Sequence, residues 1–337
     1  MADIDPLDAL PNIEPDDNSS GTGDDDSAYH GSIGTNSYAT TLATSVRNYV
    51  YANGRRYNSF RAGEYILPND EAEQDRMDLG HHIYKLLLDG GLYTSPIKAN
   101  PRRVLDIGTG TGIWAIDFAD EHPESQVIGN DLSPIQPSWV PTNCIFEIDD
   151  IEAAWPYVRP FDFIHAREMA GSISDFDKLF RQAYDHLVPG GYFEIQSIEP
   201  FFYSDDDTLS QAKQMVEWQE LEFEASEKFG KPLGVVPTFH DKLKKTGFED
   251  VQTRVVKLPM GSWPKERRMK ELGRFQQHQL LQALEPYSLF LFTTVLGWTV
   301  EATQVLLAGV RADIHNRDVH AYSKVFFTRG MKPENAV

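Results

Sequence analysis

Cysteine and basic side chains are both scarce in this sequence of 337 residues, whose one cysteine is Cys144. A single thiol excludes a disulfide within the chain and a zinc site built from clustered cysteines, and it is typical of a reducing compartment. Lys and Arg number 31 against 51 Asp and Glu, which gives a formal charge of −20. Non-specific binding to nucleic acid or to anionic lipid depends on clustered positive charge. We therefore expect no nucleic-acid partner, no membrane partner and no metal site.

Long apolar runs are also missing. The uncharged, mainly apolar stretch at residues 287–300 is too short to span a bilayer. The first residues lack the basic start and the apolar run of a signal peptide. These features predict a cytoplasmic protein, with the nucleus as the alternative location.

Residues 1–40 differ in composition from the rest of the chain. They contain nine acidic residues, no Lys or Arg, and many Gly and Ser. Such a segment buries too little apolar surface to offset the entropy lost on ordering, so we expect a disordered acidic tail. Acidic tails also serve as interaction segments, and a protein partner that binds this tail is a second interpretation.

From about residue 101, short β-rich runs alternate with helical ones, as in a parallel α/β sheet. The predicted strands cover residues 103–107, 126–131, 144–148, 161–165 and 191–197, with later β-like runs at 251–258 and 321–328. We divide the chain into the tail, a helical cap at 41–100, a ligand-binding α/β core at 101–200, and the rest of the core with a helical insertion at 201–337.

The cap contains one clear helix start. Asp70 and Glu73 have the spacing of a capping box, and apolar positions from Met77 onward recur on one helical face. A helix of about 20 residues is predicted to begin there. Residues 45–68 mix Tyr and Arg with turn residues and predict an ordered but irregular segment.

The first predicted strand runs into the glycine-rich turn of VLDIGTGTG, residues 104–112, and a helix follows. Glycines at 108, 110 and 112 let a ligand approach the backbone, and the helix N-terminus offers free N–H groups. Gly110, Gly112 and Ala115 also match a G-x-G-x-x-A dinucleotide pattern. However, the strand ends at residue 107, and counting from Gly108 puts Ile113 where that pattern needs a small residue. The register therefore disfavours NAD.

Carboxylates mark the ligand edge of the predicted sheet. Asp106 would repel a pyrophosphate if unpaired, but it suits the ammonium and sulfonium groups of S-adenosylmethionine. Asp131 ends the second strand, nineteen residues after Gly112, where a carboxylate can accept both ribose hydroxyls. Asp149 and Asp150 follow the third strand, where either could bind the adenine amino group, and we favour Asp150. A helix cap or a solvated loop is the structural alternative for each.

The segments DIGTGTG, GNDLSP, EIDD, FDFIHAR and HLVPGGYFEI, in this order, resemble the class I methyltransferases. YANGRRYNSFRAGEYILPNDEAEQDRMD, GTGIWAIDFA, DLSPIQP and GWTVEATQVLL narrow the resemblance to the fungal LaeA-like methyltransferases. The resemblance covers about residues 48–330 and implies an α/β, Rossmann-like sheet of about seven strands with a helical cap and insertions. The family contains a regulator of secondary metabolism as well as pathway enzymes.

The resemblance implies S-adenosylmethionine as the cofactor. The residues expected to bind it are Asp106, Gly108, Thr109, Gly110, Gly112, Asp131, Leu132, Asp149, Asp150 and His165, with Tyr57 and Arg61 of the cap. Thr109 stands where many relatives have Cys, and Asn130 where an apolar residue often precedes the ribose carboxylate; neither departure removes a backbone donor or the carboxylate. His81 and His82 lie on the cap helix and could reach the ligand.

Methyl transfer needs alignment, exclusion of water and, for a hydroxyl acceptor, removal of a proton. His165, Arg167 and Glu168 end the fourth strand at the ligand edge and are the candidate catalytic residues. The alternative is that His165 packs at the strand end and Arg167 pairs with a carboxylate. Glu194 and Glu199 receive no role.

An aromatic group in the helical insertion predicts the acceptor pocket: Trp218, Trp263, Trp298, Phe290 and Phe292. Such a pocket would take an apolar or aromatic small molecule, although core packing explains many aromatic residues equally well. We therefore expect a methyltransferase that acts on a small molecule in fungal secondary metabolism. A LaeA-like regulator that acts through a partner complex is the alternative.

Overall fold

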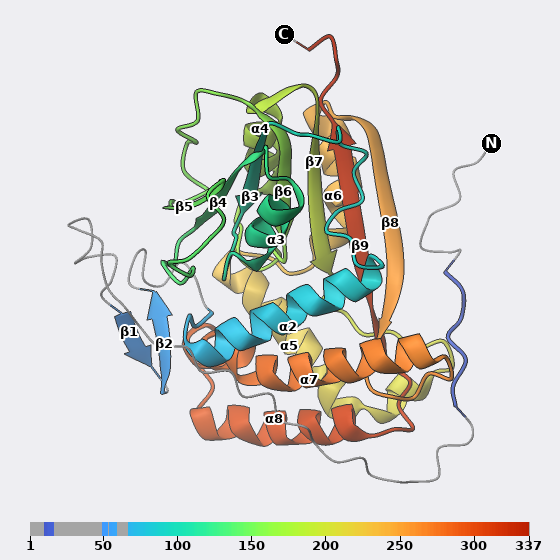
Figure 1. Cartoon of the computed structure of the whole chain (residues 1–337). Coiled ribbons are helices and arrows are strands. Elements are labelled where there is room, and N and C mark those ends of the chain that lie inside the picture. Colours follow the sequence, from blue (N-terminus) through green and yellow to red (C-terminus); the bar gives the residue numbers. More distant parts are fainter. Residues whose placement is uncertain (1–9, 17–48, 53, 59–66, 337) are drawn as a thin grey trace.

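The computed structural model describes residues 10–16, 49–52, 54–58 and 67–336. Its centre is a seven-stranded sheet in the order β5-β4-β3-β6-β7-β9-β8 (Figure 1). The strands are β3 (Arg103–Ile107), β4 (Gln126–Asp131), β5 (Cys144–Ile148), β6 (Phe161–Arg167), β7 (Leu187–Ile198), β8 (Glu249–Pro259) and β9 (Tyr322–Met331). The first five are parallel, and β9 lies antiparallel between β7 and β8.

This sheet confirms the predicted α/β fold and its seven strands. β3, β4 and β5 have the predicted bounds, because apolar runs between turn residues limit them on both sides. β6 continues two residues further, to Arg167, and β7 is longer at both ends than predicted. β8 and β9 contain or extend the two later β-like runs.

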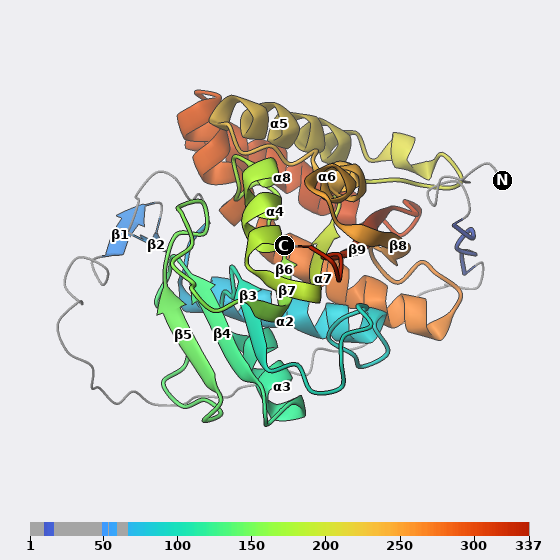
Figure 2. The same ribbon diagram turned by 90° about the horizontal axis from the view of Figure 1, so that it is seen from above.

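Helices cover both faces of the sheet, and a further helical layer lies at one end of it. The helices are α2 (Glu71–Leu87), α3 (Ile113–Glu121), α4 (Phe176–Asp185), α5 (Lys213–Phe229), α6 (Phe239–Thr246), α7 (Arg267–Phe290) and α8 (Val300–His315), with short turns at Thr208–Gln211, Val236–Thr238 and Leu291–Val295. Seen from above, α3 lies on one face and α4 and α6 on the other (Figure 2).

The helical layer is formed by α2, α5, α7 and α8 (Figure 1). α5, α7 and α8 share one apolar core, separate from the core under α4 and α6. The Met77 side chain of α2 lies against the turn that follows β3, since a Cβ on Gly110 would be 3.1 Å from its sulfur. The layer therefore closes the edge of the sheet at which the parallel strands end.

The start of α2 confirms the predicted helix cap. Asp70 precedes the helix, and its carboxylate accepts a hydrogen bond from the backbone N–H of Glu73 at 3.1 Å. The same carboxylate receives two bonds from the Arg55 guanidinium, at 2.6 and 2.8 Å. Arg55 therefore ties the preceding segment to the helix.

That segment is more regular than predicted. β1 (Tyr49–Ala52) and β2 (Arg55–Asn58) form an antiparallel hairpin, with Gly54 at a φ of 76° between them. The sequence signal was the pair Asn53-Gly54 between two β-rich runs, which is typical of a two-residue hairpin turn.

Part of the predicted tail packs against the core. Pro15 pairs with Pro264, and the backbone of Asp16 donates to the carbonyl oxygen of Trp263 at 2.8 Å. Asp16 also forms an ion pair with Lys270 of α7. The predicted disorder is therefore wrong for residues 10–16, whose acidic side chains meet lysines of the core. Most of the tail lies outside the described residues.

Candidate functional site

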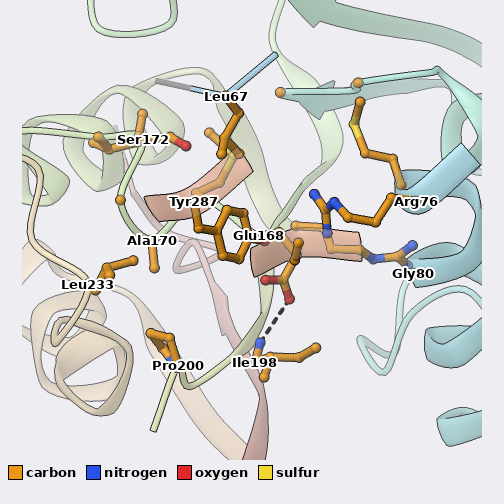
Figure 3. Close-up of a pocket in the computed structure, with 18 of the residues that line it drawn as sticks. Leu67, Arg76, Gly80, Glu168, Ala170, Ser172, Ile198, Pro200, Leu233 and Tyr287 are labelled. Atoms are coloured by element: carbon orange, nitrogen blue, oxygen red, sulfur yellow. Dashed lines mark hydrogen bonds between the residues drawn. The ribbon is translucent and has the colours of Figure 1, made fainter. Parts of the chain in front are cut away.

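A cavity of about 280 Å³ lies between the strand ends and the helical layer. One side, which we call the cofactor half, is lined by Asp106, residues 108–111, Asp131, Leu132, Asp149, Asp150 and His165. The other side, the acceptor half, is lined by Arg76, Glu168, Trp218, Glu222, Gln276, Tyr287 and apolar neighbours. Figure 3 shows the Arg76 guanidinium and the Glu168 carboxylate beside the Tyr287 ring.

The glycine turn has the backbone conformation that its sequence predicts. Gly108, Gly110 and Gly112 all have positive φ angles, of 63°, 58° and 82°. Side chains are strained in this region, and a Cβ on Gly112 would lie 2.3 Å from the ring of Phe146. The turn therefore brings bare backbone to the wall of the cavity.

Asp131 ends β4 beside this turn. Its carboxylate accepts hydrogen bonds from the backbone N–H of Gly110 at 2.8 Å and of Ser133 at 2.9 Å. Burial raises the pKa of this carboxyl to about 6, and the neighbouring Asp106 adds to the rise, while the two backbone donors oppose it. Each oxygen retains lone-pair capacity for a ligand hydroxyl.

Asp106 is paired, unlike the free carboxylate considered from the sequence. One oxygen accepts the Thr109 hydroxyl at 2.6 Å, and the other contacts Nδ1 of His165 at 2.7 Å. His165 is fully buried and stacks on Trp114 with 3.8 Å between ring centroids. Burial lowers the pKa of His165, against the effect of Asp106. Its Nε2 has no hydrogen-bond partner among the described residues.

The acidic pair after β5 is held by local hydrogen bonds. Asp149 accepts from the backbone N–H of Asp150, and Asp150 accepts from the backbone N–H of Glu152, both at 2.8 Å. Both residues line the cavity beside Leu132, and Asp150 is the more buried of the two. Both carboxylates lie at the cavity wall, and this geometry does not distinguish Asp149 from Asp150 as the predicted contact of the adenine amino group.

These groups fit an adenosyl cofactor with a cationic sulfur. Turn residues 108–111 and a strand-end carboxylate meet at one wall, and the Asp106–His165 pair lies beside them. No group of three His, Cys, Asp or Glu side chains suited to a metal occurs in the part of the chain that the structure describes. No described helix has the length and apolar character needed to cross a membrane.

Arg167 and Glu168, at the end of β6, reach the acceptor half. Arg167 donates to Gln196 at 3.0 Å and contacts Nδ1 of His81 at 3.1 Å. Among the described residues it forms no ion pair with a carboxylate. Its guanidinium lies over the Tyr84 ring, 4.4 Å from the centroid. Burial lowers the pKa of Arg167.

Glu168 has a φ of 54°, which is uncommon for a side chain other than glycine. Its Oε1 accepts the Tyr84 hydroxyl and the backbone N–H of Ile198, the latter at 2.8 Å (Figure 3). Burial raises the pKa of the Glu168 carboxyl, whereas the Tyr84 and Ile198 bonds and the charge of Arg76 lower it. Strained backbone of this kind concentrates at functional sites.

Of the remaining predicted ligand contacts, some line the cavity and others do not. His81 lines the cavity and contacts Asp117 at 3.0 Å, whereas the exposed His82 packs against Phe275 outside the described lining. Tyr57 is half-buried in β2 and is absent from the described lining. Arg61 lies outside the described residues.

The aromatic residues predicted to form the acceptor pocket also lie partly at the cavity and partly elsewhere. Trp218 lines the acceptor half, but Phe292 is buried in the core of α5, α7 and α8, and Trp298 packs against that core. Trp263 lies elsewhere and donates to the carbonyl oxygen of Ala321 at 3.1 Å. Glu194, to which we gave no role, accepts from Thr94 and Ser95 and anchors their loop.

Several polar residues that line the acceptor half were missed, among them Arg76, Glu222, Gln276 and Tyr287. A signal was present in the helix patterns. Glu222 occupies the same stripe of α5 as Met215, Trp218 and Ala225, all buried. A polar side chain in an otherwise apolar stripe faces the interior, and Gln276 holds a similar place in α7.

Comparison with known proteins agrees with this geometry. A family model described as Methyltransferase domain matches residues 79–253. Methyltransferase pytC of Aspergillus terreus is 43% identical over 303 residues, covering 90% of this chain and 94% of that protein. Secondary metabolism regulator laeA of Monascus pilosus is 36% identical over 285 residues, covering 83% and 77%. Probable methyltransferase tdiE of Emericella nidulans is 32% identical over 301 residues, covering 88% and 93%. The chain therefore belongs to the fungal LaeA-like family of S-adenosylmethionine-dependent methyltransferases.

Proposed function

We propose that this methyltransferase acts on a hydroxyl or amine group of a small, mainly apolar molecule, and that Glu168 accepts the proton which this group loses. The observation that carries the proposal is a buried carboxylate in the wall of the acceptor half, held by Tyr84 and Ile198. The reaction belongs to specialised metabolism in this proposal, and the names of the relatives support that setting.

In this proposal the cofactor half holds S-adenosylmethionine. The backbone of the glycine turn would contact the cofactor directly. Asp131 would accept hydrogen bonds from the ribose hydroxyls, and Asp149 or Asp150 would bind the adenine amino group. When bound, the cofactor supplies a methyl group activated by a sulfonium. Leu132 lines the same wall, and Arg61 remains a proposed contact of the cap.

Glu168 is suited to proton transfer by its bonding. Both of its hydrogen bonds end on Oε1, so we assign Oε2 to the acceptor. A lone pair of the heteroatom forms the new bond to carbon, and the bond from that carbon to sulfur would break with its electron pair left on sulfur. The O–H or N–H proton moves to Oε2, and the electron pair of that bond stays on the heteroatom. A raised pKa brings a carboxylate closer to the strength that a general base needs near neutral pH.

His165 and Arg167 act in this proposal as positioning residues. His165 holds the carboxylate of Asp106 through Nδ1 and is itself held by Trp114. Arg167 spans Gln196 and His81 and lies over Tyr84, which donates to Glu168. Each therefore orients a group that faces a ligand.

The acceptor half supports an apolar or aromatic acceptor. Its wall includes Leu67, Pro200, Phe202, Trp218, Leu233 and Leu280. Apolar walls with a few fixed polar groups are typical of sites for small organic molecules. The polar groups then select the acceptor.

Replacing Glu168 tests the proposal. Glu168→Gln keeps an oxygen for Tyr84 and Ile198 but cannot take a proton, so kcat should fall about 10²- to 10⁴-fold while S-adenosylhomocysteine binds unchanged. Because burial raises the pKa of Glu168, kcat/KM should fall as pH drops through that pKa. The matched control is Glu199→Gln, a buried glutamate bound to Tyr203 outside the described lining. Equal rates for the two variants would overturn the assignment.

A regulator that acts through a partner is the second candidate, with the protein partner bound by the acidic tail in the cytoplasm or the nucleus. The charge of residues 1–40 and the regulators among the relatives favour it. Deleting the whole tail would remove the packed residues 10–16, so the sharper variant changes Asp24, Asp25 and Asp26 to Asn. Cellular function that survives Asp131→Ala but not this change would favour the regulator over the enzyme.

A further inference from the structure

Glu222 of α5 is a buried carboxyl group in the wall of the acceptor half, with 4% of its surface exposed. The Trp218 indole N–H donates to Ser288 Oγ at 2.7 Å, and the Ser288 hydroxyl donates to Glu222 Oε1 at 2.8 Å. This chain of bonds fixes the carboxyl group and occupies Oε1. The mechanism proposed above does not use it.

Glu222 is uncharged near neutral pH, because burial raises its pKa to about 8. Ser288 and Trp218 oppose the rise only by donating hydrogen bonds. Among the described residues, Tyr287 of α7 is the titratable neighbour whose pKa the charge of Glu222 affects. Burial raises the pKa of Tyr287 as well. Since Oε1 accepts from Ser288, the proton resides on Oε2, and the group acts as an O–H donor.

Gln276 of α7 supplies the complementary group. It lines the same cavity and is 5% exposed, and its Oε1 has no hydrogen-bond partner among the described residues. A buried polar atom without a partner is costly and rare in folded proteins. A ligand that donates a hydrogen bond would remove that cost.

We propose that Glu222 and Gln276 form a polar subsite that binds a neutral acceptor through its carbonyl oxygen, which receives a hydrogen bond from Glu222, and through an N–H or O–H group that donates to Gln276. This inference rests on the proposed function and names its substrate class: an aromatic or alicyclic molecule with a carbonyl group and an N–H or O–H group. The subsite recognises the acceptor, whereas Glu168 takes the proton at the reacting atom.

Two matched probes test the Glu222 contact by calorimetry on the full chain saturated with S-adenosylhomocysteine. 2-Acetylnaphthalene has a carbonyl group, 2-ethylnaphthalene lacks it, and neither ionises. The carbonyl probe should bind about 5- to 10-fold more tightly, as one buried hydrogen bond allows. Glu222→Met should abolish this preference without weakening the ethyl probe. Glu220→Met, on the exposed side of the same helix, should preserve it.

A pH series and a third probe test the contributions of Glu222 and Gln276 independently. Affinity for 2-acetylnaphthalene should fall between pH 7 and pH 9 as Glu222 loses its proton, and Glu222→Gln, which keeps a donor, should show no such fall. Gln276→Leu should weaken 2-naphthamide, which carries an N–H group, but not 2-acetylnaphthalene.

Several results would overturn the subsite. One is equal affinity for 2-acetylnaphthalene and 2-ethylnaphthalene, and another is that neither probe binds the chain saturated with S-adenosylhomocysteine. A third is a preference for the carbonyl probe that persists in Glu222→Met. Failure of S-adenosylhomocysteine to bind would instead contradict the proposed function on which the subsite rests. Tight binding of 2-(aminomethyl)naphthalene, which is an ammonium ion at neutral pH, with loss of a proton from Glu222 would replace the neutral acceptor by a cationic one.

Discussion

The two halves of the cavity are built in different ways. The cofactor half comes from strand ends and turns between residues 106 and 165, and backbone groups make many of its contacts. The acceptor half comes from α2, the end of β6, α5 and α7, whose side chains come from positions as far apart in the sequence as Arg76 and Tyr287. The first half therefore follows from local sequence, and the second depends on how three helices meet.

The difference shows what each half can tolerate. The glycine turn of the cofactor half requires residues without a Cβ, so adding a single methyl group changes its backbone conformation. A wall of side chains can exchange one polar group for another and keep its shape. Substitutions in the two halves should accordingly have different kinds of effect.

The largest effect is expected at Gly112. Gly112→Ala places a Cβ 2.3 Å from the Phe146 ring at a φ of 82°, so the turn or the ring must shift. We expect S-adenosylhomocysteine to bind at least about 100-fold more weakly by calorimetry, since the turn supplies several contacts at once. Gly230→Ala is the control, because Gly230 has a φ of 85° and no atom near the new Cβ. Retained affinity in Gly112→Ala would mean that the turn does not hold the cofactor.

A stability change of a few kcal/mol is expected in the acceptor half. The folded pKa of Glu222 is about 8, above that of a free glutamate. Its contribution to stability is therefore complete below pH about 4.5 and is lost as pH rises through 8. Glu222→Gln keeps the bond from Ser288 and does not titrate, so its free energy of unfolding should exceed that of the unchanged chain by about 5 kcal/mol at pH 9 and match it at pH 4.5. Urea unfolding at several pH values measures this, and the exposed Glu220→Gln should show no such trend.

A smaller effect is expected from the protonation of Asp131. Its carboxyl has a folded pKa of about 6, and ribose hydroxyls bind the charged form better. Affinity for S-adenosylhomocysteine should therefore rise about tenfold from pH 5 to pH 7, with proton uptake or release seen as a dependence of the binding enthalpy on the buffer. A flat profile would place the ribose elsewhere.

The sequence predicted the sheet well because its strands are buried apolar runs bounded by turn residues. It also pointed to Asp106, Asp131, Gly108 and Gly110, which lie beside those boundaries and line the cavity, whereas Gly112 lies outside the described lining. The partners of Asp106 were not predictable in the same way, since β6 brings His165 next to β3 only through strand pairing. The polar residues of α5 and α7 were missed because their burial depends on neighbouring helices. Residues 10–16 were misjudged because composition does not show that Lys265 and Lys270 face them.

α2 belongs to both halves of the cavity. Met77 lies against Gly110 of the turn, the Arg76 guanidinium lies 5.2 Å from the Tyr287 ring centroid, and a Cβ on Gly80 would be 2.8 Å from Gln279 of α7. A displacement of this helix by one ligand alters the walls that the other ligand meets. Thermodynamic linkage requires the two effects to be equal, so the factor by which the cofactor strengthens acceptor binding is also the factor by which the acceptor retains the cofactor. The position of one helix therefore enters the affinity of the protein for both ligands.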